Sequence, residues 1–199
     1  IVFGKHERQV IERLKAGESR EDLASLGTAA VIDVSFEVAK GETFVVMGLS
    51  GSGKSTLIRM INGLWSPSEG TVEVAGKVVS DMNDAQLREL RRDHVSMVFQ
   101  HFALLPHLTV RENAAYGLKL QGKLKQKERL EKANEWLHTV GLEGWEDKYP
   151  HQLSGGMQQR VGLARALAAE TDILLMDEAF SALDPLIRRE MQDQLLELQ

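Results

Sequence analysis

The chain has 199 residues, of which 43% are hydrophobic and 27% are charged, a balance typical of a folded globular protein rather than a disordered one. Its formal net charge is −5 and it has no long basic run, which argues against a nucleic-acid-binding surface. It has no cysteine, no signal-peptide pattern at its N-terminus and no apolar run long enough to cross a bilayer. We therefore expect a soluble, cytosolic protein.

The first third of the chain begins with helical patterns and continues with strand patterns. Residues 6–27 have a polar helical pattern with a restart inside it, which predicts two short helices. Hydrophobic and polar residues alternate from 32 to 38, which predicts a half-buried strand, and the apolar run at 43–47 predicts a buried parallel strand. A helix pattern follows at residues 57–63.

In the remainder of the chain, helix and strand patterns alternate only before residue 101 and after residue 141. Between residues 101 and 141 the strand signals stop and helical patterns replace them. An all-helical segment therefore interrupts an α/β core. The expected elements outside the 101–141 segment are an antiparallel β excursion over 71–79, a helix at 84–92, a strand at 95–99, a helix from 154 to 167, a strand at 173–176 and a last helix opening at Asp184-Pro185.

A glycine-rich loop joins the predicted strand 43–47 to the helix after it. It reads Gly48-Leu49-Ser50-Gly51-Ser52-Gly53-Lys54-Ser55-Thr56 and matches the phosphate-binding loop G-x-x-x-x-G-K-[ST] in the strand–loop–helix context that this motif requires. Glycines let backbone N–H groups face phosphates, and the helix N-terminus adds partial positive charge. Lys54 is placed to reach the β- and γ-phosphates, and the Ser55 hydroxyl to ligate Mg²⁺. The alternative is a glycine-rich turn with a solvated lysine. The ATP-binding residues that we expect are Gly48, Ser50, Gly51, Ser52, Gly53, Lys54, Ser55 and Thr56.

Two adjacent carboxylates, Asp177 and Glu178, follow the predicted strand 173–176. Asp177 can hold Mg²⁺ directly or through a water, and Glu178 can take the proton of an attacking water. Adjacent acids after a strand are also common as helix N-caps. The phosphate loop elsewhere in the chain favours the catalytic interpretation.

A second candidate anion site lies in Leu153-Ser154-Gly155-Gly156-Met157-Gln158-Gln159-Arg160. The serine and glycines predict a helix N-cap with bare N–H groups. One ATP has one γ-phosphate, which the phosphate loop already holds, so the economical explanation is that this cap closes over the ATP of a second chain. The ordinary alternative is a serine N-cap with glycines for close packing.

Together these motifs resemble the ATP-binding subunit of ABC transporters. The resemblance spans residues 28–199 and includes, in order, the phosphate loop, Gln100, the 153–160 motif, the 173–178 motif and Ser181-Ala182-Leu183-Asp184. It implies an α/β fold: a P-loop NTPase (RecA-like) core with a mainly parallel sheet, an antiparallel β edge and an inserted all-helical signature subdomain. It also implies an ATPase with ATP and Mg²⁺ as cofactors, working as a head-to-tail homodimer.

The resemblance assigns a role to each site residue. The catalytic residues would be Glu178, Gln100 and Lys54, and the metal ligands Ser55, Gln100 and Asp177. The residues that meet the partner's ATP would be Ser154, Gly155, Gly156 and Gln158, and Asp184 would line the dimer interface.

The resemblance also predicts the domain boundaries. We expect a helical N-terminal extension at 1–27 and an ABC ATPase domain at 28–199, with a nucleotide-binding core at 28–100 and 165–199 and a helical subdomain at 101–164. The family has a γ-phosphate-sensing histidine on a strand that would follow Gln199. We therefore expect a truncated C-terminus, and negligible ATP hydrolysis by residues 1–199 alone until the C-terminus is extended.

Finer similarity indicates a subfamily. The segments 99–110, 47–50 and 176–188, together with the helical extension beginning Ile1-Val2-Phe3-Gly4, are similar to importers of glycine betaine, proline and other quaternary amines. This implies peripheral attachment to the cytoplasmic face of the inner or plasma membrane, permease subunits as partners, an extracytoplasmic solute-binding protein as an indirect partner, and no nucleic acid. Two alternatives stay open: an importer ATPase for another solute such as methionine or a polyamine, and a soluble ABC ATPase acting in DNA repair or on ribosomes.

Two contacts are left open by the sequence. Family members often stack the adenine on an aromatic residue before the phosphate loop, where this chain has Ser25-Leu26-Gly27. Phe3 could fold back to replace it, or the partner could supply a stacking group. The membrane subunit would be contacted by residues after Gln100, although helical-subdomain packing is an equally good explanation for them. These candidates are Phe102, Leu104, Leu105 and Pro106.

Overall fold

The computed structural model describes residues 1–100, 102–180 and 185–197. The chain divides into two compact units, Ile1–Leu87 and Arg88–Gln199. Each unit has its own hydrophobic cluster: a small one in the first unit and a larger one in the second. Among the described residues, no helix is both long enough and apolar enough to cross a membrane.

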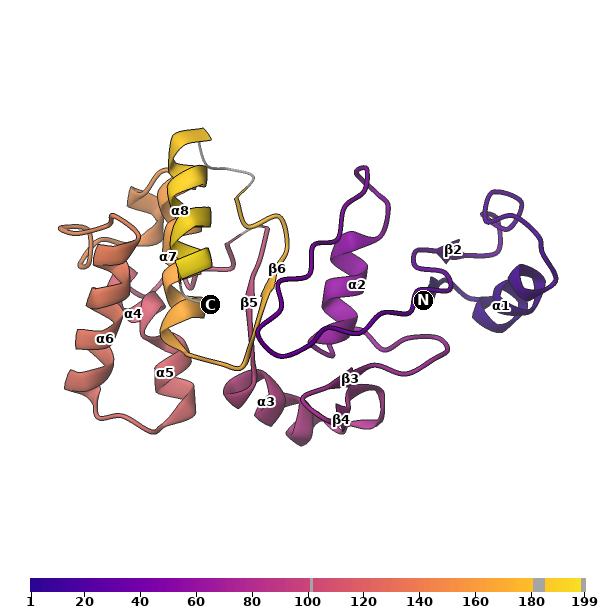
Figure 1. The fold of residues 1–199 in the computed structure, drawn as a ribbon, viewed down its shortest axis with the longest axis horizontal. Helices are drawn as coiled ribbons and strands as arrows, with labels where there is room; N and C mark the ends of the chain where they lie inside the picture. The colour runs from indigo at the N-terminus through magenta and orange to yellow at the C-terminus, as the bar shows by residue number, and fades with distance from the viewer. Residues whose placement is uncertain (101, 181–184, 198–199) are drawn as a thin grey trace. The chain divides into compact units, whose positions relative to one another are not determined.

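The N-terminal part of the first unit is a helical excursion between two paired strands. Strand β1 (Val2–Phe3) pairs antiparallel with β2 (Thr28–Ala29), and helix α1 (Glu7–Lys15) lies in the connection (Figure 1). The predicted second helix is wrong, because residues 20–26 form successive turns. Backbone hydrogen bonds between residues three positions apart, such as Leu26 N to Leu23 O, close these turns. The chain then enters β2 before a regular α-helix can form. Four buried residues make the cluster: Val2, Val10, Leu23 and Ala29.

The two strands predicted at 32–38 and 43–47 are also wrong. Both segments are described in full, and neither forms a sheet ladder. The two segments form the arms of a turn, in which Glu42 N donates to Ala39 O at 3.1 Å. Phe36 of the first arm stacks on Phe44 of the second, with ring centroids 4.7 Å apart. Alternation and β-branching favour extended backbone, but a strand also needs a partner whose N–H and C=O groups match it in register.

The rest of the first unit matches the sequence prediction more closely. Helix α2 (Lys54–Ile61) begins directly after the glycine-rich loop, three residues earlier than predicted. Strands β3 (Glu73–Val74) and β4 (Lys77–Val78) form the predicted antiparallel hairpin, and the short helix η1 (Val79–Asp81) follows. Helix α3 (Asp84–Asp93) leads into the second unit.

The second unit is built on two parallel strands. Strand β5 (Val95–Val98) pairs with β6 (Ile173–Met176), with Val95 opposite Ile173 and Val98 opposite Met176. Parallel strands need a long crossover, and the predicted helical segment supplies it (Figure 1). Its helices are α4 (Val110–Ala114), α5 (Tyr116–Gln121), α6 (Gln126–Thr139), η2 (Pro150–Gln152) and α7 (Gly155–Ala168), and α8 (Pro185–Glu197) follows β6.

The core of the second unit lies among these helices. Val110, Ala114 and Leu137 come from α4 and α6, and Val161 and Ala164 from α7; all five are fully buried. Partly buried Leu174 and Met176 of β6 pack against the same cluster. Helix α7 is therefore fixed against both the other helices and the strand pair, and it holds the residues that surround the end of β6.

Candidate functional site

The glycine-rich loop of the first unit has the backbone that its sequence predicts. Gly51 and Gly53 have positive φ values of +77° and +93°, which glycine adopts without steric cost. Gly53 is the N-cap of α2 and makes no side-chain cap, so the first turn of the helix is open to an anion. A Cβ added at Gly53 would collide with the carbonyl oxygen of Ala30. Only glycine fits at this position.

Lys54 lies over the same loop. Its Nζ donates to Gly48 O and to Leu49 O, each at 2.9 Å, and Ser52 N closes the loop on Leu49 O at 3.1 Å. A Cβ at Gly48 would lie 2.6 Å from Ser52 Oγ. The ammonium group, the glycines and the helix N-terminus thus converge within one short segment, an arrangement suited to a polyphosphate.

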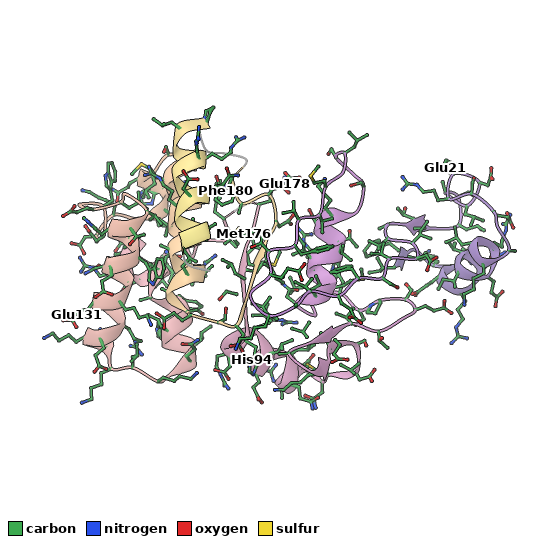
Figure 2. The ribbon with its side chains drawn as sticks, in the orientation of Figure 1. Glu21, His94, Glu131, Met176, Glu178 and Phe180 are labelled. Atoms are coloured by element: carbon green, nitrogen blue, oxygen red, sulfur yellow. The ribbon has the colours of Figure 1, made fainter. Side chains whose placement is uncertain are left out.

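In the second unit, Gln100 and Glu178 lie together although they are far apart in the sequence. Gln100 follows β5 and Glu178 follows β6, and Gln100 Nε2 donates to Glu178 Oε2 at 2.9 Å. Parallel pairing brings the carboxyl ends of both strands to one edge, where ligands bind in open α/β sheets. Figure 2 shows Met176 in β6 with Glu178 and Phe180 beyond its end. Glu178 was predicted from its motif and Gln100 from the family resemblance, and the structure supplies the contact between them.

Asp177 and Glu178 differ sharply in environment. Asp177 is 1% exposed, and its N–H extends the strand pairing by donating to Val98 O at 3.0 Å. Glu178 is exposed and has a φ of +51°, a left-handed conformation that is uncommon for a residue with a side chain and is found preferentially at functional sites. The backbone therefore presents the Glu178 carboxylate toward solvent and toward Gln100.

Helix α7 contacts this edge through a residue that the sequence did not single out. Gln159 is 1% exposed, and its Nε2 donates to the carbonyl oxygen of Glu178 at 3.4 Å. Leu163, one helical turn after Gln159, is also buried. An amide on an otherwise apolar face of a helix is a pattern that can be recognised in the sequence. Polar residues on a buried helix face need specific partners.

The 153–160 motif forms the predicted helix cap. Ser154 is the N-cap of α7, and its hydroxyl accepts from Met157 N at 3.4 Å. Gly155 is exposed, and a Cβ there would have nothing within 4 Å. Gln158 Nε2 donates to the carbonyl oxygens of Pro150 and Leu153 at 3.0 and 3.2 Å. Within the subunit, this amide therefore stabilises the turn before the cap.

Residues after Gln100 are held by two side chains that the sequence analysis did not identify. Asn113 is fully buried; its Oδ1 accepts from Leu105 N at 2.8 Å, and its Nδ2 donates to the carbonyl oxygens of Leu105, Leu108 and Thr109. Arg165 of α7 donates to the carbonyl oxygens of Phe102 and Ala103. Burial lowers the pKa of the Arg165 guanidinium. Of the four candidates for a membrane-subunit contact, Leu104 packs on the core and Pro106 is exposed.

Two further predictions concern adenine stacking and the dimer interface. The pairing of β1 with β2 does fold Phe3 back beside Thr28. The Phe3 ring packs edge-on against Trp65, with centroids 4.9 Å apart, and stays 38% exposed. Leu26, in the stretch where an aromatic was expected, packs on the small cluster instead. Asp184 and residues 181–183 lie outside the described residues.

The three residues predicted as metal ligands come from both units, with Ser55 in the first and Gln100 and Asp177 in the second. Gln100, Asp177 and Ser55 offer amide, carboxylate and hydroxyl oxygens, the ligands that Mg²⁺ prefers. Among the described residues, no three His, Asp or Glu side chains gather in a way that could hold a metal ion.

Comparison with known proteins gives a consistent match along the chain. The profile of the ABC transporter family matches residues 31–181. The glycine betaine transport ATP-binding protein OpuAA of Bacillus subtilis is 57% identical over 199 residues, covering 99% of this chain. The chain belongs to the ABC transporter family. It spans 47% of the length of OpuAA.

Another member of the family resembles the chain over a smaller share of its length. The methionine import ATP-binding protein MetN of Bacillus subtilis is 54% identical over 156 residues, covering 78% of this chain and 45% of MetN. The betaine-type relative therefore matches a larger share of the chain.

A solved ABC cassette confirms the fold class. The ATP-binding cassette MJ0796, in a dimeric post-hydrolysis state bound to ADP and Pi, superimposes with a TM-score of 0.82 at 39% identity, covering 85% of this chain and 74% of that chain. The predicted α/β P-loop NTPase fold, with its parallel strands and helical insertion, is confirmed.

Proposed function

We propose that this chain is the ATP-hydrolysing subunit of an ABC importer for glycine betaine, proline or related quaternary amines. The observation on which this proposal chiefly depends is the match to OpuAA along 99% of the chain, which includes the β1–α1–β2 excursion as well as the ATPase motifs. The contact between Gln100 and Glu178 supports ATP hydrolysis as the reaction, because an amide and a carboxylate lie together at the end of two parallel strands.

ATP binding would begin at the phosphate loop. Lys54 Nζ now donates to two loop carbonyl oxygens, and it would exchange these neutral acceptors for the negatively charged oxygens of the β- and γ-phosphates. The N–H groups at the start of α2 would surround the same phosphates. Ser55, Gln100 and Asp177 would supply oxygen ligands to Mg²⁺, which when bound neutralises negative charge on the transferred phosphoryl group.

Hydrolysis would depend on Glu178 as the general base. The carboxylate would accept a proton from the water that attacks the γ-phosphorus atom, so that ATP and water give ADP and phosphate. Gln100 donates to one carboxylate oxygen, which leaves the other free to accept that proton. The bond therefore orients the base before substrate arrives, and such preorganisation reduces the reorganisation needed in the transition state.

A second copy of the chain would complete each site. The Ser154 cap and the open surface at Gly155 would approach the γ-phosphate bound by the partner, with Gly156 and Gln158 beside them and Asp184 at the interface. A homodimer would thus hold two ATP molecules, and hydrolysis would remove the γ-phosphate that joins the two chains. Permease subunits would couple this opening and closing to transport at the cytoplasmic face of the membrane, with a solute-binding protein acting on their other side.

An importer for methionine is the second candidate. MetN supports it by its identity but matches only 78% of the chain, against 99% for OpuAA. A polyamine importer or a soluble ABC ATPase has no comparable observation in its favour.

The test is uptake by the assembled natural transporter in liposomes loaded with ATP. We expect labelled glycine betaine to be taken up and methionine and spermidine to be excluded. A matched transporter with Glu178→Gln should take up none of them. Uptake of methionine but not of glycine betaine would overturn the assignment of solute, and Glu178-independent uptake would overturn the assignment of the ATPase.

A further inference from the structure

The backbone after Gln100 has an uncommon conformation. Phe102 and Ala103 are consecutive residues with left-handed φ values of +57° and +47°. Such conformations cost free energy in residues with side chains and persist only where the surroundings fix them. Phe102 N donates to Phe99 O at 3.1 Å, so Gln100 lies inside a closed turn between the end of β5 and this strained pair.

Arg165 of α7 is the side chain that fixes this pair. Its Nη1 donates to Ala103 O at 2.7 Å and its Nη2 to Phe102 O at 2.9 Å. Two successive carbonyl oxygens therefore accept from the two arms of one guanidinium, whose planar fork holds two acceptors in fixed geometry. Among the described residues, no carboxylate forms an ion pair with Arg165. Its positively charged guanidinium therefore bonds to these two carbonyl oxygens instead of to a carboxylate.

The same helix contacts Glu178 as well as the loop that follows Gln100. Gln159, six positions before Arg165, donates to Glu178 O. Between them, Gly162 lies against the strained loop: a Cβ added there would be 3.5 Å from Phe102 O. Helix α7 thus braces the loop after Gln100 at one point and the Glu178 backbone at another.

We propose that Arg165 is a positioning residue for ATP hydrolysis, which holds the loop after Gln100 so that the Gln100 amide stays aligned on the Glu178 carboxylate. The proposal rests on the proposed function, because it concerns the same ATPase site. It predicts that loss of the guanidinium changes the rate of the chemical step rather than the binding of ATP, since Arg165 donates to Phe102 and Ala103 and the proposed phosphate ligands are in residues 48–56.

The test compares two arginines of the second unit in the full-length protein. Arg111 of α4 lies outside the proposed ATP site and also bonds within this unit, with its Nε donating to Asn134 Oδ1 at 2.9 Å and its Nη1 paired with Asp147, so Arg111→Met is the control for Arg165→Met. We expect Arg165→Met to lower kcat by roughly tenfold to a hundredfold, as for a small misplacement of a catalytic group. KM for ATP should change by less than about twofold, so kcat and kcat/KM fall together.

Amide hydrogen exchange gives an independent readout. Arg165→Met should speed exchange at Phe102 N, whereas Arg111→Met should leave exchange at Phe102 N and the kcat per folded molecule at their parental values. Arg165→Lys tests the fork itself, because an ammonium on a single flexible stem is a point charge. It should keep the fold and recover only part of the rate, and it decides the matter if Arg165→Met does not fold.

Three results would be decisive. A parental kcat in both Arg165 variants, alongside an inactive Glu178→Gln, would overturn the proposal while leaving the ATPase assignment intact. An equal loss of kcat in Arg111→Met would also overturn it, because the effect would then come from general loosening of the second unit. If the parent has no Glu178-dependent hydrolysis, the proposed function itself fails, and exchange at Phe102 N still decides whether Arg165 holds the loop.

Discussion

The phosphate loop and the Gln100–Glu178 pair are built in opposite ways. The loop depends on contacts between near neighbours: Lys54 bonds to the carbonyl oxygens of Gly48 and Leu49, and the segment before it has exposed apolar side chains, with Met47 85% exposed. The pair joins residues 78 positions apart, and Gln159 braces it from a buried helix.

This difference separates two tasks within one reaction. In the loop, the Lys54 ammonium donates to carbonyl oxygens of the loop itself and must exchange these acceptors for phosphate oxygens when ATP binds. Substitutions in the loop should therefore change the affinity for ATP. The pair is already aligned by tertiary packing, so substitutions there should change the rate of hydrolysis. Each prediction below would sharpen this division if confirmed and would break it if wrong.

Glu178→Gln should have the largest effect. Loss of a general base lowers the rate by roughly 100- to 10,000-fold, whereas ATP affinity should remain near that of the parent because no loop contact is changed. Phosphate release under single-turnover conditions measures the first quantity and calorimetry the second. Parental turnover would show that Glu178 is not the base.

Lys54→Ala should act on affinity. Loss of a charge-assisted contact to phosphate costs on the order of 1.5–3 kcal/mol, which we expect to appear as weaker ATP binding by calorimetry. Lys40→Ala, at an exposed lysine of the same unit, is the matched control and should bind ATP as the parent does. Equal affinity for all three proteins would contradict the assigned role of the loop.

Asn113→Ala should destabilise the second unit without a direct effect on ATP. The substitution leaves the Leu105 N–H without its side-chain acceptor and the Leu108 carbonyl oxygen without its side-chain donor, and each unsatisfied buried group costs about 1–3 kcal/mol. Thermal and denaturant unfolding should both report the loss. A variant as stable as the parent would mean that water replaces the amide at no cost.

Gly155→Ala should have the smallest effect on the subunit itself. Nothing lies within 4 Å of the added Cβ, and alanine in a helix is favoured over glycine by about 0.5–1 kcal/mol, so stability should hold or rise slightly. ATP-dependent association of two chains should weaken, because the partner's ATP would meet the methyl group. Gly162→Ala, in the same helix, should leave association unchanged, and equal behaviour of both variants would argue against a partner at Gly155.

Local motifs could be predicted from the sequence, and long-range contacts could not. The glycines and Lys54 of the loop, the Ser154 cap and the acids after β6 follow from short-range rules. The arms at 32–38 and 43–47 were predicted as strands because their side-chain patterns fit, but strand pairing depends on partners that such patterns do not specify. Gln159, Asn113 and Arg165 were missed because an amide or guanidinium in a helical pattern is usually at the surface, and only tertiary packing shows which carbonyl oxygens they meet.

The central claim is that two copies of this chain complete each other's ATP sites. It is tested most directly by measuring the mass in solution of the full-length Glu178→Gln protein with Mg²⁺ and ATP, with ADP as the comparison. The account predicts a dimer holding two ATP molecules with ATP and a monomer with ADP. A protein that binds ATP tightly and remains monomeric at saturating ATP would contradict it.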